Sequence, residues 1–126
     1  MFNREQVIKQ LIEQFPEIED ELTDAIWAGL LHLEVACFTR YTQAQIESGN
    51  KTELSKCFEL AEKFFINGNP DIKNAIYVSY LEHLNLTNGK KQRKWAFELM
   101  PRILQKGYQE INSYLDQIHK AKERIR

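Results

Sequence analysis

The chain has 126 residues, of which 43% are hydrophobic and 28% are charged, with five glycines, three prolines and a formal net charge of −1. This length allows one domain with a single core, the composition argues against disorder, and the few glycines and prolines argue against a turn-rich all-β protein. The nearly neutral net charge gives no overall attraction to nucleic acid or membrane. The charge is unevenly distributed, because residues 1–34 carry eight acidic and two basic side chains whereas residues 90–126 carry four acidic and ten basic ones.

Helix start and stop signals divide most of the chain into segments of helical periodicity. Asn3 begins a motif that resembles a capping box, and Pro16 ends the helix that follows, because the residue before a proline is disfavoured in the α region. Gly49 and Gly68 are typical helix ends, and Pro70 is a typical first helical residue. The predicted helices cover residues 3–15, 25–48, 52–67, 70–84, about 95–100 and 103–125, with a loop at residues 85–89.

The most apolar stretch runs from Ala25 to Tyr41. Its apolar residues recur at steps of three and four and form two neighbouring rows, so it is predicted to begin a central helix that is buried from several sides. The first row, expected to face the core, consists of Ile26, Leu30, Leu33, Cys37 and Tyr41. With 17 residues that include His32, Glu34 and Arg40, the stretch is too short and too polar to span a membrane.

The expected fold is all-α, with about six or seven helices in one domain that covers residues 1–126. The turns between segments 25–48, 52–67 and 70–84 contain two or three residues, and such short turns make antiparallel neighbours. The sequence therefore predicts an irregular helical bundle or a short α-solenoid of antiparallel helix pairs. Segment 103–125 has coiled-coil-like apolar spacing but is too short for an independent coiled coil, so it is expected to pack across the domain.

Few residues offer catalytic or metal-binding chemistry. Asp116 and His119 would share one helical face, but a metal site needs several such pairs, and the chain has no glycine-rich phosphate loop and no CxxC motif. No enzyme activity, metal or cofactor is therefore expected. Cys37 and Cys57 lie in apolar rows and are predicted to be reduced thiols in the core. Residues 1–15 do not resemble a signal peptide, so the expected location is the cytoplasm.

Acidic residues crowd into positions 17–24, in greater number than helix capping requires. They are Glu17, Glu19, Asp20, Glu21 and Asp24. Two interpretations stay open: a plain solvated helix face, or a docking surface whose negative field attracts a cationic partner. Glu34 and Glu82 fall within apolar stretches, where each is expected to reach a partner such as Arg40, Lys73, a tyrosine hydroxyl or a helix end, or to line a partner-facing groove.

A basic segment precedes the aromatic residues Trp95 and Phe97. It consists of Lys90, Lys91, Arg93 and Lys94. Basic residues interleaved with aromatic ones can form a nucleic-acid patch, but the same pattern fits a solvated loop followed by a buried helix face. An alternative function is therefore a nucleic-acid-associated helical module that uses these cations and Arg102. A general helical scaffold for protein–protein contacts is a third possibility.

Two segments carry a resemblance to a known group of proteins. The first is Phe15-Pro16-Glu17-Ile18 after an amphipathic helix, followed by a long apolar helix, and the second is the stretch from Asn74 to Leu84 before a loop and a basic aromatic helix. Together they resemble the small all-α bacterial immunity proteins of polymorphic toxins, including contact-dependent growth inhibition systems. The resemblance covers roughly residues 11–104, rests mostly on apolar positions, and brings no catalytic motif with it.

The resemblance implies a cytosolic protein that binds one cognate toxin domain and blocks its active site. Many such toxins are nucleases, whose active sites must be basic to hold phosphates, so carboxylates of an inhibitor can take the place of phosphate charges. The expected partner is therefore a basic toxin domain rather than nucleic acid or a membrane. The residues expected to face it are Glu17, Glu19, Asp20, Glu21 and Asp24, with Trp27 as an aromatic anchor. The oligomeric state stays open.

Overall fold

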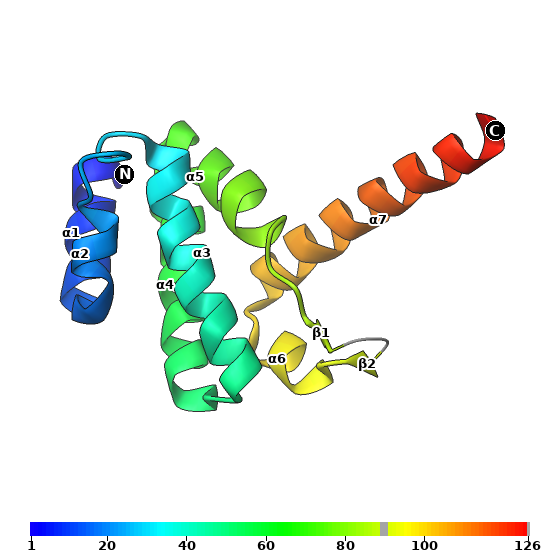
Figure 1. Cartoon of the computed structure of the whole chain (residues 1–126), viewed down its shortest axis with the longest axis horizontal. Coiled ribbons are helices and arrows are strands. Elements are labelled where there is room, and N and C mark those ends of the chain that lie inside the picture. The colour runs from blue at the N-terminus through cyan, green and yellow to red at the C-terminus, as the bar shows by residue number, and fades with distance from the viewer. Residues whose placement is uncertain (89–90, 126) are drawn as a thin grey trace.

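The computed structural model describes residues 1–88 and 91–125, which are mostly helical (Figure 1). In chain order the elements are α1 (Arg4–Gln14), the 3₁₀ turn η1 (Pro16–Ile18), α2 (Glu19–Leu22), α3 (Leu31–Ser48), α4 (Lys51–Asn67), α5 (Pro70–Ala75), the π-helix η2 (Ile76–Leu81), the strands β1 (Thr87–Asn88) and β2 (Lys91–Gln92), α6 (Lys94–Leu99) and α7 (Arg102–Ile125). The predicted all-α fold with about seven helices is confirmed. No helix in this part of the chain has both the length and the apolar character that crossing a membrane requires.

The helix signals at the ends of α1, α3 and α5 act as the sequence predicts. The Asn3 side chain accepts a hydrogen bond from the Gln6 backbone N–H at 2.9 Å, and the Gln6 side chain accepts one from the Asn3 backbone N–H at 2.9 Å, which completes the capping box. Gly49 ends α3 in the left-handed region with φ of 72°. Asn69 caps α5 through a 2.9 Å bond from the Ile72 N–H.

The central helix begins at Leu31, so the predicted start at Ala25 is wrong. Residues 24–30 form turns, in which the Asp24 carboxylate accepts the Ile26 N–H at 2.9 Å and Gly29 has φ of 93°. A side chain that bonds its own backbone two residues on offers an alternative to the helix, and glycine allows the left-handed conformation that ends this turn. The predicted core row is wrong at its beginning as a result: Ile26 is 79% exposed, and Leu30 and Leu33 are also exposed.

The core is centred on Phe38, in the middle of α3. Its ring stacks on Tyr80 of η2 at a centroid distance of 4.7 Å and on Phe15 at 5.9 Å, and it meets Phe64 of α4 edge-on at 6.4 Å. The fully buried Tyr80 hydroxyl hydrogen-bonds the Thr42 hydroxyl at 3.0 Å, so the one polar group in this aromatic cluster is satisfied. The core therefore joins α3 to α4, to η2 and to the end of α1.

Helix α7 packs on the bundle only through its first half. At Gly107 the helices approach so closely that an added Cβ would lie 2.9 Å from the Leu81 Cδ1 atom of η2. Leu104 and Ile111 of α7 are buried, but Tyr114 is 64% exposed, and Leu115 and Ile118 are exposed as well. Figure 1 shows the second half extending away from the other helices. The prediction that segment 103–125 packs across the domain is wrong for this half.

A short hairpin follows η2, where the sequence predicts a loop and no strands. Strands β1 and β2 are antiparallel, with Thr87 opposite Gln92 and Asn88 opposite Lys91. An Asn-Gly dipeptide is a strong hairpin signal, and the sequence contains one at residues 88–89. With two residues in each strand, the hairpin shows no alternating pattern by which it could be predicted.

Candidate partner-binding surfaces

The acidic segment, defined as Glu17, Glu19, Asp20, Glu21 and Asp24, lies on η1, α2 and the turn that follows. Glu19 and Asp20 are exposed, and their side chains have no hydrogen-bond or ion-pair partner within residues 1–88 and 91–125. Glu17 is exposed and accepts the Tyr41 hydroxyl at 2.7 Å. These three carboxylates therefore present negative charge to the solvent.

The other two acids of the segment also have structural roles. Glu21 is half-buried and forms an ion pair with Arg40 of α3. The hydrogen bond to Glu21 raises the pKa of the Arg40 guanidinium. Asp24 is half-buried and bonds the backbone of the next turn. In the described part of the chain, none of these acids pairs with the basic residues near the C-terminus.

Trp27 is held against α2. It is half-buried, and its indole N–H donates a hydrogen bond to the Glu21 backbone carbonyl at 2.5 Å. The structure thus brings together two residues of the predicted site, Trp27 and Glu21, through a contact that positions the acidic segment. The indole N–H of a buried tryptophan usually has such a hydrogen-bond partner.

Glu34 has a structural role, and its partner differs from the partners that the sequence suggested. The side chain is 2% exposed and receives two hydrogen bonds from Arg4 of α1, from Nε to Oε1 at 2.7 Å and from Nη2 to Oε2 at 2.6 Å. The Gly29 N–H adds a third at 3.2 Å. This carboxylate therefore ties α1 to the turn before α3. Glu82 is exposed, and its side chain has no hydrogen-bond or ion-pair partner among the described residues, so the expectation that it reaches a partner is wrong.

Exposed apolar residues lie beside the acidic segment. Ile26 and Leu30 are in the turn that follows it, and Leu33 is in the first turn of α3. Leu33 also lines a hollow of about 400 Å³ between α3 and η2. The hollow is lined by His32, Leu33, Ala36, Thr39, Arg40, Gln43, Ser79 and His83. Because Arg40 lines the hollow and also pairs with Glu21, the hollow and the acidic segment are adjacent. The sequence pattern missed this surface by placing Ile26, Leu30 and Leu33 in the core.

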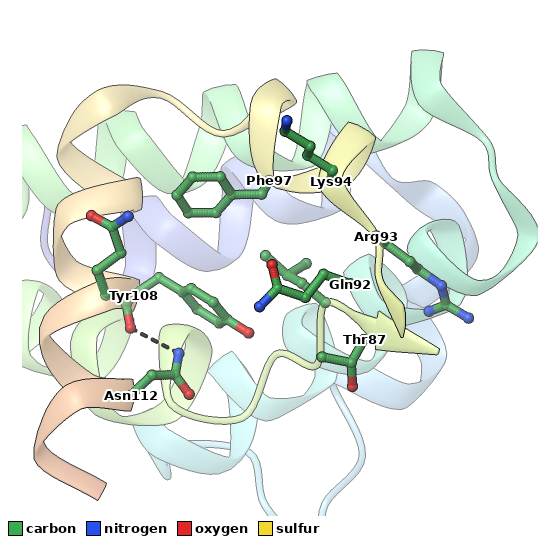
Figure 2. A pocket seen from close by; sticks show the side chains of 9 residues that line it. Thr87, Gln92, Arg93, Lys94, Phe97, Tyr108 and Asn112 are labelled. Carbon is green, nitrogen blue, oxygen red and sulfur yellow. Dashed lines mark hydrogen bonds between the residues drawn. The ribbon is translucent and has the colours of Figure 1, made fainter. Parts of the chain in front are cut away.

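A second, larger cavity of about 550 Å³ lies between the hairpin, α6 and α7 (Figure 2). It is lined by Leu86, Thr87, Gln92, Arg93, Lys94, Phe97, Tyr108, Gln109 and Asn112. Of the predicted basic segment, Arg93 and Lys94 therefore border a cavity, Lys91 is exposed on β2, and Lys90 lies outside the described residues. Arg102 is exposed at the start of α7.

Both cysteines are free thiols in the core, as the sequence predicts. Burial raises the pKa of Cys37 to about 11 and the pKa of Cys57 to about 12. Thiols with such pKa values stay protonated and unreactive near neutral pH. No group of three histidine, cysteine or acidic side chains that could hold a metal occurs among the described residues.

Comparisons with known proteins give one match. The model of the family described as "Domain of unknown function (DUF7674)" matches residues 8–116. That range contains the acidic segment, the hollow between α3 and η2, and every residue that lines the larger cavity. No curated protein and no solved structure matches the chain.

Proposed function

The chain belongs to this family of unknown function, and on that premise we propose a function from its surface: it is an immunity protein that binds and neutralises a cognate bacterial toxin domain. The acidic segment and the neighbouring apolar residues Ile26, Leu30 and Leu33 cover the active site of the toxin, and the chain acts without catalysis. The observation that supports this proposal is the pair of exposed carboxylates, Glu19 and Asp20, which have no cation from within the described chain.

The physical argument rests on complementary charge and on apolar contact. A nuclease active site carries cations that hold phosphates, so the acidic segment attracts it over several ångströms and can take the place of its substrate. Carboxylates alone would give a fast but weak encounter, because exposed ion pairs contribute little free energy. The exposed side chains of Ile26, Leu30 and Leu33 supply an apolar centre that loses water on binding, which is where interfaces gain most affinity.

The proposal places this binding in the cytoplasm, where a toxin domain that enters the cell meets its target. Cys37 and Cys57 are buried as free thiols, an arrangement that a reducing compartment preserves. A general scaffold protein would use the same surface. The two functions differ in their partners, because an immunity protein forms a tight one-to-one complex with one cognate domain.

The test starts from the reading frame directly upstream of this chain, which the proposal expects to encode a large exported protein with a variable C-terminal domain, the candidate toxin. Co-expression of the chain should restore the growth of cells that produce this domain, and the two proteins should co-purify one to one. The Glu19→Lys/Asp20→Lys variant should weaken the complex at least tenfold, because two attractive charges become repulsive. Both side chains are exposed, so the helical content of the variant should be unchanged.

The matched control is Glu47→Lys/Glu59→Lys, which reverses two exposed carboxylates on α3 and α4 outside the acidic segment. This control should bind the toxin domain as tightly as the original chain. Equal weakening by both variants would mean that net charge alone drives the association. If the Glu19→Lys/Asp20→Lys variant still protected the cells fully from the toxin domain, the acidic segment would not be part of the interface.

A further inference from the structure

The cavity between the hairpin, α6 and α7 has walls that are fixed to one another. The Arg93 N–H donates to the Leu86 carbonyl at 2.7 Å, which closes the base of the hairpin. Gln43 of α3 holds Asn85 through two hydrogen bonds of 2.8 and 3.0 Å, so the hairpin is tied to the bundle. Gln105 of α7 donates to the Phe97 carbonyl of α6 at 2.9 Å. The cavity is therefore built by contacts between three separate parts of the chain.

Two aromatic rings line the interior of this cavity. The Phe97 and Tyr108 rings lie 6.3 Å apart between centroids and are tilted by 50°. Figure 2 shows both rings and the Gln92 amide directed into the same space. Asn112 donates to the Tyr108 carbonyl at 2.8 Å. Within the described residues, the Tyr108 hydroxyl and the Gln92 side-chain amide have no hydrogen-bond partner, so both are available to a ligand.

Two cations stand at the edge of the cavity. Arg93 is half-buried and Lys94 is exposed, and Figure 2 shows them on the hairpin and α6 side. Neither side chain has an ion-pair partner within residues 1–88 and 91–125. The charge and the aromatic surface are thus separated, with cations outside and rings inside.

We propose that this cavity binds a nucleotide, either free or as one unit of a single RNA strand. The base stacks on Phe97 or Tyr108, its polar edge hydrogen-bonds the Gln92 amide, and its phosphate lies against Arg93 or Lys94, whose side chains point to different sides of the cavity in Figure 2. The volume of about 550 Å³ falls within the range of small-molecule sites. A purely apolar ligand would leave the amide and both cations unused, and a free phosphate would leave both rings unused. The proposal does not depend on toxin binding, because toxin binding uses the acidic segment whereas this cavity uses the cations Arg93 and Lys94.

The test follows the backbone amide signals of the ¹⁵N-labelled chain by NMR during titration. The probes are AMP, adenosine, inorganic phosphate and a single-stranded RNA octamer. AMP should shift signals of the residues that line the cavity and should bind at least tenfold more tightly than adenosine, because charge-assisted hydrogen bonds to phosphate are worth roughly this factor or more. Equal affinity for AMP and the octamer would identify a free nucleotide. Tighter, salt-dependent binding of the octamer would identify an RNA strand.

Variants separate the two parts of the site. Arg93→Gln/Lys94→Gln should lower AMP affinity to that of adenosine, whereas the control Lys9→Gln/Lys73→Gln, which removes two exposed lysines from α1 and α5, should leave it unchanged. Gln92→Leu, at an exposed position, should weaken both AMP and adenosine. The proposal is overturned if neither AMP nor the octamer shifts these signals at millimolar concentration. It is also overturned if inorganic phosphate alone reproduces the shifts, or if both site variants bind AMP as the original chain does.

Discussion

Removal of the Arg4 side chain should destabilise the chain more than removal of any exposed cation. Arg4 supplies two of the three hydrogen bonds that the buried Glu34 carboxylate receives, at 2.6 and 2.7 Å. In Arg4→Met the methylene part of the side chain is kept, but Glu34 retains only the weaker bond from Gly29 at 3.2 Å. The variant therefore leaves the carboxylate of a side chain that is 2% exposed largely without a partner.

The expected cost follows from the geometry of this pair. Each hydrogen bond to a charged group contributes about 1.5 to 3 kcal/mol, and breaking a fully buried ion pair costs about 3 to 5 kcal/mol. The Arg4 side chain is 38% exposed, so water can enter the vacated position and replace part of the loss. We expect a fall of about 2 to 3 kcal/mol in the free energy of unfolding. At about 4 °C per kcal/mol, the melting temperature should fall by about 8 to 12 °C.

The assay is urea denaturation followed by circular dichroism, carried out as a double-mutant cycle with Glu34→Gln. Adding Arg4→Met to Glu34→Gln should cost much less than adding it to the original chain, because the neutral amide does not need a cation. Lys9→Met, at an exposed position on the same helix, is the control and should change stability by less than about 0.5 kcal/mol. A cost of Arg4→Met below about 0.5 kcal/mol, or the same cost in both backgrounds, would refute the reasoning.

Three further predictions concern packing and titration. Gly68→Ala should lower the unfolding free energy by about 1 to 3 kcal/mol, since the added Cβ overlaps a backbone carbonyl of α4 and a side chain of α5; wild-type stability in urea would contradict this. Leu115→Gln/Ile118→Gln should change stability by less than about 0.5 kcal/mol, because both side chains project from the bundle; a larger loss would mean that this half of α7 is packed. Burial raises the pKa of Cys37 to about 11 and the pKa of Cys57 to about 12, so both thiols release their protons at lower pH in the unfolded chain than in the folded one. The free energy of unfolding should therefore fall as the pH rises above about 9, by up to about 1.4 kcal/mol per pH unit for each thiol. Thermal melting at pH 8 and 10.5 checks this, and the melting temperature of the Cys37→Ala/Cys57→Ala variant should fall less between these pH values than that of the original chain.

Local signals in the sequence are sufficient for the helix boundaries that depend on a few neighbouring residues. The capping box at Asn3, the left-handed Gly49 and the cap before Pro70 all act within one turn of the chain, so no distant contact is needed to predict them. The burial of Cys37 and Cys57 agrees with their positions in apolar rows, although Ile26, Leu30 and Leu33 of the row that contains Cys37 are exposed.

The surface that we propose as a partner site could be predicted only in part. The acidic residues at positions 17–24 are visible in the sequence as a cluster, but which of them are engaged depends on α3, whose Arg40 and Tyr41 reach Glu21 and Glu17. Ile26 and Leu30 have the spacing of a buried helix face and are nevertheless exposed. They lie in the turns formed around Asp24 and Gly29, before α3 begins. Periodicity alone does not distinguish these two outcomes.

The sequence by itself determined an all-α domain, most of its helix ends and the uneven distribution of charge. Only the tertiary structure decided that Glu34 pairs with Arg4, that the second half of α7 stays uncovered, and that the hairpin, α6 and α7 line one cavity. The reason is one of range. Capping and periodicity act over three or four residues, whereas the burial of a side chain depends on which distant segment lies against it, and Arg4 and Glu34 are 30 positions apart in the chain.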